Sequence, residues 1–510
     1  MSVEASNSFA ALFPVPPQEM EPTQEQLAII DAKANPLKVL AFAGTGKTST
    51  LELKAKANPN LRILYLAFNK SVEMEAKQRF PSNVTVKTIH ALAWETVGRK
   101  YKVGRLAAFQ LSKVQGMSYY DAVMVIRTIE NFCNSADNDI SAMHIAKDFL
   151  KRHKTGGGSQ LIDAAKKVWS IMKQGENQDM PMTHSGYLKL FQLQFPNLPY
   201  NLILLDEAQD TNSVTQKLIM DQVRLGSEVI LVGDENQSIY SWRGAVNALT
   251  KIKAPTLYLT QSFRFGQPIA DVANKILSTY YNEKKRIQGM GLSGVGRIDQ
   301  AKPFTFIART NGTLFKKAYD LCVTRKLYIA GSVERDLPIF QVLIDFYHLW
   351  RNEKHLIKDP EIKCFNSFDE AVQLAEQECL DPEFSVSVRV VNEHGHRIPG
   401  QIEEIKQAMV LHSHEADVIL TTTHKAKGLE WDRVIIAEDF KRLFDKEGNM
   451  LPMGFLDKEV PPEEINLLYV AATRAKRELQ LNSELHRLCN PKKRPEKPED
   501  VQSGWARLKQ

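Results

Sequence analysis

The chain has 510 residues, 43% of them apolar and 25% charged, and its formal net charge is +6. It is too long for one compact core, so we expect about two to four domains, and its slight positive charge favours a polyanionic partner only where basic side chains cluster. The five scattered cysteines form no Cys-x-x-Cys pair, which argues against a disulfide framework and a structural zinc site and fits a reducing compartment. No apolar run approaches the roughly 18 residues of a membrane span, which argues against a membrane protein.

The first segment, residues 1–22, is rich in Pro, Ser and Glu and predicts a loose arm. Its short apolar stretch at 9–13 either packs against the rest of the chain or binds a partner. The arm carries acidic residues and no basic stretch, so a secretory signal is not expected.

A phosphate-binding loop is predicted at residues 41–48, which read AFAGTGKT. An apolar run at 37–40 predicts a buried strand before it, and a helical pattern follows from Thr48, as such a loop requires. Small residues let main-chain N–H groups surround phosphate oxygens, Lys47 reaches the outer phosphates, and the Thr48 hydroxyl suits Mg²⁺. Ala41 replaces the first glycine of the usual pattern, and a Gly-Thr-Gly turn without a nucleotide is the alternative. The residues expected around the nucleotide are Ala43, Gly44, Thr45, Gly46, Lys47, Thr48 and Ser49.

Strand and helix patterns alternate along the rest of the chain. Apolar strands are predicted at 61–68, 84–86, 202–205, 229–232, 256–259, 305–308, 418–421 and 434–437. Residues 91–193 and 337–415 have mostly helical periodicity, and the tail after Pro491 is rich in Lys, Pro and Glu. The pattern predicts an α/β protein with two cores of buried, parallel strands, each interrupted by a helical insertion.

Two adjacent carboxylates, Asp206 and Glu207, follow the strand at 202–205. Asp206 is suited to hold Mg²⁺, and Glu207 to orient and deprotonate an attacking water. Neighbouring carboxylates repel each other unless a cation lies nearby. A solvated acidic turn is the alternative.

A polar and aromatic segment follows the strand at 229–232. Gln237 offers a neutral amide that can sense a terminal phosphate. Tyr240 and Trp242 lie two residues apart beside Arg243, and rings of this kind stack nucleic-acid bases with about 1–3 kcal/mol each and no sequence preference. Packing of both rings in the core is the alternative.

Taken in order, these motifs resemble those of superfamily 1 helicases of the UvrD/Rep kind, and most closely the F-box DNA helicase group. The segments at 67–71 (AFNKS) and 184–190 (HSGYLKL) also resemble that group, and the matching motifs run from Gln26 to Lys476. The resemblance implies two RecA-like cores of the P-loop NTPase class. It implies an arm at 1–22, a first core at 23–90 and 195–265 with an insertion at 91–194, a second core at 266–336 and 416–490 with a short insertion at 337–415, and a basic mobile tail at 491–510.

The resemblance also implies roles for single residues at an ATP site. Gln26 matches the glutamine that reads adenine, and Phe263 matches the ring that stacks on it, where relatives usually have Tyr. Glu430 matches a ribose contact close to Gly428. The catalytic set is Lys47, Asp206, Glu207, Gln237, Arg264 and Arg474, with both arginines at the γ-phosphate and with Thr48 and Asp206 as the metal ligands.

A second group of residues matches positions that contact DNA in the family. The segment around Asn69 is one residue shorter than in UvrD. Either Asn69 or its neighbour Lys70 is therefore placed to contact the DNA strand. The residues implied to contact nucleic acid are Asn69, Lys70, His90, Tyr240, Trp242, Arg243, Asn311 and His424.

The implied protein is an ATP-dependent DNA helicase or translocase that uses Mg²⁺ and moves 3′ to 5′ on single-stranded DNA in repair or recombination. We expect a monomer, cytoplasmic or, in a eukaryote, nuclear. Because Lys47 and Arg474 fall in different cores, hydrolysis is expected to require closure of the cores. A translocase that strips recombinase or single-strand-binding proteins with little unwinding, a nucleotide-switched DNA-binding regulator, and RNA as the substrate stay open. No nuclease domain after Arg474 and no F-box before Gln26 are expected.

Overall fold

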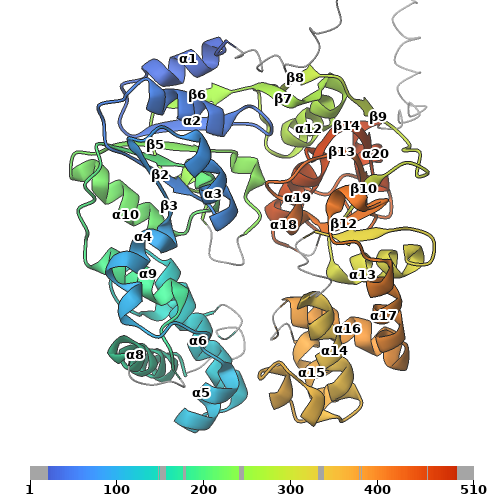
Figure 1. Cartoon of the computed structure of the whole chain (residues 1–510). Helices are drawn as coiled ribbons and strands as arrows, with labels where there is room; N and C mark the ends of the chain where they lie inside the picture. Colours follow the sequence, from blue (N-terminus) through green and yellow to red (C-terminus); the bar gives the residue numbers. More distant parts are fainter. Residues whose placement is uncertain are drawn as a thin grey trace, which may run out of the picture.

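The computed structural model describes residues 21–146, 149, 157–175, 180–240, 246–330, 338–377, 380, 382–456 and 458–490. Most of the predicted arm and all of the predicted tail lie outside these residues. Two lobes stand side by side, each with a sheet at one end and a group of helices at the other (Figure 1). No described helix is long and apolar enough to cross a bilayer.

The first core is a six-stranded sheet in the order β3-β2-β4-β5-β1-β6, with every neighbouring pair parallel. Its strands are β1 (Leu37–Ala41), β2 (Ile63–Ala67), β3 (Val84–Thr88), β4 (Leu202–Leu205), β5 (Glu228–Gly233) and β6 (Thr256–Leu259). The helices of this core are α1 (Gln24–Asp31), α2 (Lys47–Lys56), α3 (Lys70–Arg79), α10 (Ser213–Arg224) and α11 (Ala248–Lys251).

Helices cover both faces of this sheet. Alternate residues of β4 belong to two different apolar clusters, with Leu202 and Leu204 facing the side of α1 and α2, and Ile203 and Leu205 facing the side of α10. The uninterrupted apolar runs seen in the sequence are therefore central strands buried on both faces.

The second core is another six-stranded sheet, ordered β11-β12-β10-β13-β14-β9, and its pairs are also parallel. Its strands are β9 (Gly294–Val295), β10 (Phe304–Ala308), β11 (Leu327–Ile329), β12 (Val418–Thr422), β13 (Trp431–Ile436) and β14 (Ala475–Gln480). Its helices are α12 (Gln267–Tyr280), α13 (Asn311–Leu321), α18 (Thr423–Ala426), α19 (Pro462–Ala472) and α20 (Ser483–Cys489). A separate pair, β7 (Gln261–Gly266) and β8 (Gln288–Gly291), lies where the chain passes from one core to the other.

Each sheet is interrupted by a helical segment. The first insertion lies between β3 and β4 and carries α4 (Ile89–Thr96), α5 (Ala108–Gln115), α6 (Tyr119–Asn134), α8 (Gly158–Gln174) and α9 (His184–Leu193). The second insertion lies between β11 and β12 and carries α14 (Pro338–Trp350), α15 (Phe368–Glu376), α16 (Pro382–His394) and α17 (Ile398–Ala408).

The two lobes contact each other at both ends. At the sheet end, Phe42, Ala43 and Ile239 of the first core belong to the apolar cluster of the second core. At the helical end, Arg105 forms an ion pair with Glu361, and the rings of Tyr119 and Phe365 lie 5.9 Å apart. The fold therefore brings the carboxyl ends of β1, β4 and β5 against the second core, and ligands of open parallel sheets bind at such ends.

Candidate functional site

The predicted phosphate loop connects β1 to α2 and depends on two glycines. Gly44 and Gly46 have φ of +76° and +77°, the left-handed region that side chains disfavour. A Cβ on Gly44 would lie 2.6 Å from both the Ser262 Oγ and the Arg264 Cβ. The loop is also tied to β7, because Ser262 Oγ donates to Ala43 O at 2.9 Å. Its shape thus leaves the main-chain N–H groups of α2's first turn able to face a phosphate.

Gln26 and Phe263 lie together beside this loop. The Gln26 amide bonds the Thr23 N–H and the Thr50 hydroxyl, and the Phe263 ring is 40% exposed. Phe263 is held by its main-chain N–H, which donates to Gly44 O at 2.9 Å. The structure therefore brings the two predicted nucleobase residues to one side of the loop.

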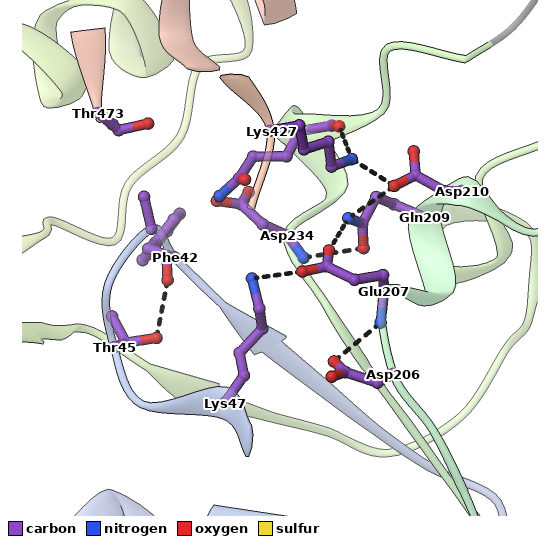
Figure 2. Close-up of polar contacts among 12 residues, drawn as sticks. Phe42, Thr45, Lys47, Asp206, Glu207, Gln209, Asp210, Asp234, Lys427 and Thr473 are labelled. Carbon is purple, nitrogen blue, oxygen red and sulfur yellow. Dashed lines mark hydrogen bonds and ion pairs between the residues drawn. The ribbon is translucent and has the colours of Figure 1, made fainter. Parts of the chain in front are cut away.

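The acidic pair lies at the end of β4, opposite Lys47. Lys47 Nζ is 3.6 Å from Glu207 Oε1, and Figure 2 shows the ammonium pointing at that carboxylate. Glu207 has φ of +49°, unusual for a residue with a side chain, and its N–H donates to Asp206 Oδ1 at 2.9 Å. The strained turn aims the two carboxylates in different directions.

Their surroundings give the two carboxyls opposite pKa shifts. Burial, followed by the charge of Glu207, raises the pKa of Asp206 to about 6. Burial would also raise the pKa of Glu207, but Lys47, Lys427, a hydrogen bond from Gln209 and Arg474 outweigh it and lower the pKa to about 2. Glu207 is therefore ionised at neutral pH and can accept a proton or hold a water.

The predicted metal ligands meet at one buried hydroxyl. Tyr65 OH donates to Asp206 Oδ2, and the Thr48 side chain also hydrogen-bonds Tyr65. No group of three or more His, Cys, Asp or Glu side chains suited to a metal occurs among the described residues. A magnesium ion needs fewer protein ligands, because it keeps several waters and binds substrate phosphates. One hydroxyl and one carboxylate converging beside the phosphate loop fit that requirement.

A lysine of the second core reaches into this acidic site. Lys427 Nζ donates to the buried Asp210 carboxylate (Figure 2). It also donates to Gln237 O and lies 5.3 Å from the centre of the Tyr240 ring. Gln209 links Glu207 to the N–H of Asp234. No role had been predicted for Lys427, Gln209, Asp210 or Asp234, although each lies one to three residues from a predicted site residue.

A continuous line of hydrogen bonds joins the phosphate loop to Arg474. The Ala43 N–H donates to Tyr469 OH at 3.3 Å, and Tyr469 OH donates to Asp234 Oδ2 at 2.8 Å. Gln237 Nε2 donates to the same Asp234 oxygen at 2.8 Å, and Gln237 Oε1 accepts from Arg474 Nη2 at 3.3 Å. Every side chain in the line is buried. Burial and the neighbouring Arg264 lower the pKa of Arg474 to about 9, which leaves it charged at neutral pH.

Helix α19 and the residues that follow it provide most of these contacts from the second core. Asn466 Nδ2 donates to Ser238 O at 2.8 Å, one turn before Tyr469 and two turns before Thr473. The Thr473 carbonyl accepts from Arg264 Nη1 at 3.1 Å. A single helical face therefore meets the phosphate loop, the stretch at 233–240 that carries Gln237 (the Gln237 segment), and β7.

Arg264 and Glu430, predicted for the γ-phosphate and the ribose, bind each other. Arg264 Nε is 2.6 Å from Glu430 Oε2. Gly428, with φ of +84°, lies in the turn just before Glu430. The pair lies at the boundary of the two cores, and the sequence had not indicated this direct contact.

The described residues predicted to contact nucleic acid lie in several separate places. Asn69 Oδ1 caps α3 by accepting from Val72 N, and Lys70 is an exposed side chain paired with Glu73. The Tyr240 ring stacks on Phe68 at 5.5 Å, and its hydroxyl donates to the His424 carbonyl. Their positions link β2, the Gln237 segment and α18.

Two further residues of that predicted group are largely enclosed. His90 lies on α4 against the rings of His184 and Tyr187, and burial followed by His184 lowers the pKa of His90 to about 4. Asn311 begins α13, and its Oδ1 is buried with no hydrogen-bond partner among the described residues. Trp242 and Arg243 lie outside the described residues.

Comparison with known proteins identifies helicases as relatives of this chain. Residues 22–254 match the UvrD/REP helicase N-terminal domain, and residues 388–484 match the UvrD-like helicase C-terminal domain. The chain is 35% identical to F-box DNA helicase 1 of Gallus gallus over 514 residues, which cover 92% of this chain and 50% of that protein. It is 31% identical to F-box DNA helicase protein 1 of Schizosaccharomyces pombe, covering 91% and 58%. ATP-dependent DNA helicase PcrA of Leuconostoc citreum is 25% identical, covering 51% and 39%.

The fold and the site together define a P-loop NTPase with two RecA-like cores. Within that class, the chain belongs to the UvrD/Rep helicase family. It spans about half the length of the curated relatives that it matches over most of its own length.

Proposed function

We propose that the chain is an ATP-driven motor on single-stranded DNA, acting as a DNA helicase. The observation that carries the proposal is the junction of the two cores at the phosphate loop, where Tyr469 meets Ala43 and Arg474 meets Gln237. Charge around a γ-phosphate determines the rate of phosphoryl transfer, and this junction gathers Lys47, Arg264 and Arg474 from both cores.

In this proposal the chain's own residues divide the work. Lys47 binds the outer phosphates, and the ionised Glu207 holds the attacking water and accepts its proton. Gln237 senses the terminal phosphate, and Arg474 stabilises the charge that develops there. Thr48 and Asp206 would hold magnesium, which would neutralise negative charge on the phosphates.

Coupling to DNA follows from the same junction. Tyr240 and His424, from different cores, touch each other beside Lys427, which reaches the acidic site. A change in the separation of the cores therefore moves both predicted DNA-contacting residues. By resemblance to the UvrD/Rep family we also propose 3′ to 5′ movement, a role in repair or recombination, a monomeric state, and a nuclear location in a host that has a nucleus.

The test is ATP hydrolysis measured at fixed salt with single-stranded DNA, duplex DNA and RNA in parallel. We expect stimulation by single-stranded DNA, and loss of turnover by at least about a hundredfold in Lys47→Ala and Glu207→Gln. Lys56→Ala on the same helix, which removes only an exposed partner of Glu52, should retain turnover. Normal turnover in a folded Glu207→Gln protein would remove Glu207 from the proposed role.

The second candidate is a translocase that strips proteins from DNA. It is favoured because the second insertion, which carries α14 to α17, is short compared with that of UvrD. Recombinase filaments and single-strand-binding proteins are the partners proposed for it. Strand displacement measured beside translocation separates the two: translocation at normal rates with little displacement favours the second candidate.

A further inference from the structure

The amide of Gln26 and the ring of Phe263 border the same side of the phosphate loop. A Cβ on Gly46 would lie 3.4 Å from Gln26 Nε2 and 4.0 Å from Phe263 Cδ2. Glu25 fixes their separation, because its carboxylate accepts from both the N–H and the hydroxyl of Thr260 at 2.7 Å, just before the strand that carries Phe263.

The two partners of Gln26 determine which way its amide points. The Thr23 N–H can only donate, so the Gln26 oxygen faces it, at 2.9 Å. The Thr50 hydroxyl gives its hydrogen to Gly46 O at 2.9 Å, so it can only accept from Gln26 Nε2, at 3.1 Å. If the amide were flipped, its NH₂ group would face the Thr23 N–H, so two donors would meet. Its oxygen would face the Thr50 oxygen, whose hydrogen is already given to Gly46 O, so two acceptors would meet. Each mismatch would leave buried polar groups unpaired, which costs free energy.

Held in this way, Gln26 still has one acceptor site on its oxygen and one hydrogen on its nitrogen. An acceptor beside a donor matches the edge of adenine, whose N6 amino group donates and whose N7 accepts. Guanine presents O6 and N7 on that edge, and both are acceptors. An amide locked in this orientation therefore distinguishes the two purines, whereas a freely rotating amide adapts better to either.

The geometry points to Thr50 as the residue that sets nucleobase specificity, by locking the Gln26 amide in the orientation that accepts adenine. Thr50 is 1% exposed and lies in the first turn of α2. It is therefore a positioning residue that acts through Gln26. The inference rests on the proposed nucleotide site and adds to it the origin of the preference for ATP over GTP.

The experiment measures binding of ATP and GTP by displacement of a fluorescent ATP analogue, with Mg²⁺ and without DNA. We expect the unmodified chain to prefer ATP by about 5- to 150-fold, the range for one bidentate contact to a base. Thr50→Val should reduce this preference at least about fivefold, mainly by weakening the binding of ATP. Thr50→Ser should restore it, and Thr324→Val, at an exposed position of the second core, should leave it unchanged.

If Thr50→Val weakens the binding of ATP and of GTP equally, the inference is overturned, because Thr50 would then have a purely structural role. Absence of a preference in the unmodified chain would overturn it as well. If Thr50→Val does not fold, Thr50→Ala gives the same readout with a smaller side chain. Because DNA is absent from the assay, a chain that prefers ATP but shows no DNA-stimulated hydrolysis would sink the proposed motor and leave this inference standing.

Discussion

At the scale of single residues, Tyr469 of the second core carries a buried hydroxyl that bonds two groups of the first core. Its hydroxyl accepts from the phosphate loop and donates to Asp234, and the side chain is fully buried. Burial, the charge of Asp234 and this hydrogen bond raise the pKa of Tyr469 well above its usual value, so the hydroxyl keeps its proton at any working pH.

We predict that Tyr469→Phe lowers DNA-stimulated turnover about tenfold while leaving the fold intact. The change removes one hydroxyl, so the Ala43 N–H and Asp234 each lose a buried partner, at about 1–3 kcal/mol. Tyr280→Phe is the matched control, because the Tyr280 hydroxyl is buried without a hydrogen-bond partner among the described residues. Steady-state kinetics on both variants check the prediction, and equal rates in the two would contradict it.

His90 gives a prediction about pH. Its pKa is about 4 in the folded chain against an ordinary 6.5. Between these values the unfolded chain takes up a proton that the folded chain does not, so stability falls as the pH falls from 6.5 to 4. We predict that His90→Gln reduces this loss by about 1–3 kcal/mol. Urea unfolding across that pH range measures it, with exposed His355→Gln as the control; parallel curves for His90→Gln and the unmodified chain would contradict it.

The sequence predicts that candidate site residues lie close together where they follow the ends of apolar strands. Lys47, Asp206 and Glu207 follow apolar strands at fixed spacing, and the structure places Lys47 against Glu207. It did not anticipate the contacts of Tyr469 with Ala43 or of Lys427 with Asp210, because these residues are hundreds of positions apart and meet only through the packing of two cores. The individual roles in catalysis and DNA contact stay predictions.

At the scale of elements, the contact between the phosphate loop and β7 limits which substitutions the loop tolerates. We predict that Gly44→Ala destabilises the chain by several kcal/mol and abolishes nucleotide binding, since the new Cβ would meet Ser262 and Arg264 at 2.6 Å. Gly116→Ala, also left-handed but with nothing within 4 Å, should cost only about 1 kcal/mol. Thermal unfolding and nucleotide binding test the pair, and a similar cost at both sites would contradict the steric account.

The predicted strands were accurate where the chain shows an apolar run, and strands that are polar or very short had not been predicted. Every residue of β2, β4 and β10 is buried, and each appears in the sequence as an apolar run. Strand β14 begins Ala475-Lys476-Arg477, is exposed in its middle and had not been predicted, since its polar residues carry no apolar run. The three-residue β11 and two-residue β9 are too short to produce a pattern.

At the scale of the whole molecule, the contact between the insertions joins the lobes a second time. Glu361 accepts from Tyr119 OH and pairs with Arg105, whose side chain is 66% exposed. An ion pair whose arginine is this exposed contributes at most about 1 kcal/mol, so the contact is easily broken.

We predict that Arg105→Ala shifts the balance between joined and separated insertions by up to about fivefold. Energy transfer between dyes on α8 and α15 measures the distance. Lys316→Ala, which removes an exposed pair with Glu393, is the control. An unchanged distance distribution in Arg105→Ala would contradict the prediction and show that the contacts of Tyr119 with Glu361 and Phe365 suffice to join the insertions.

The contacts made by α19 also restrict how this protein can evolve. Each residue of an α-helix is turned about 100° from the one before it, so inserting or deleting one residue between Asn466 and Thr473 would swing every later side chain away from its partner together. Sequence drift along this helix is therefore confined to substitutions, and descendants that change its length are expected to lose turnover in one step.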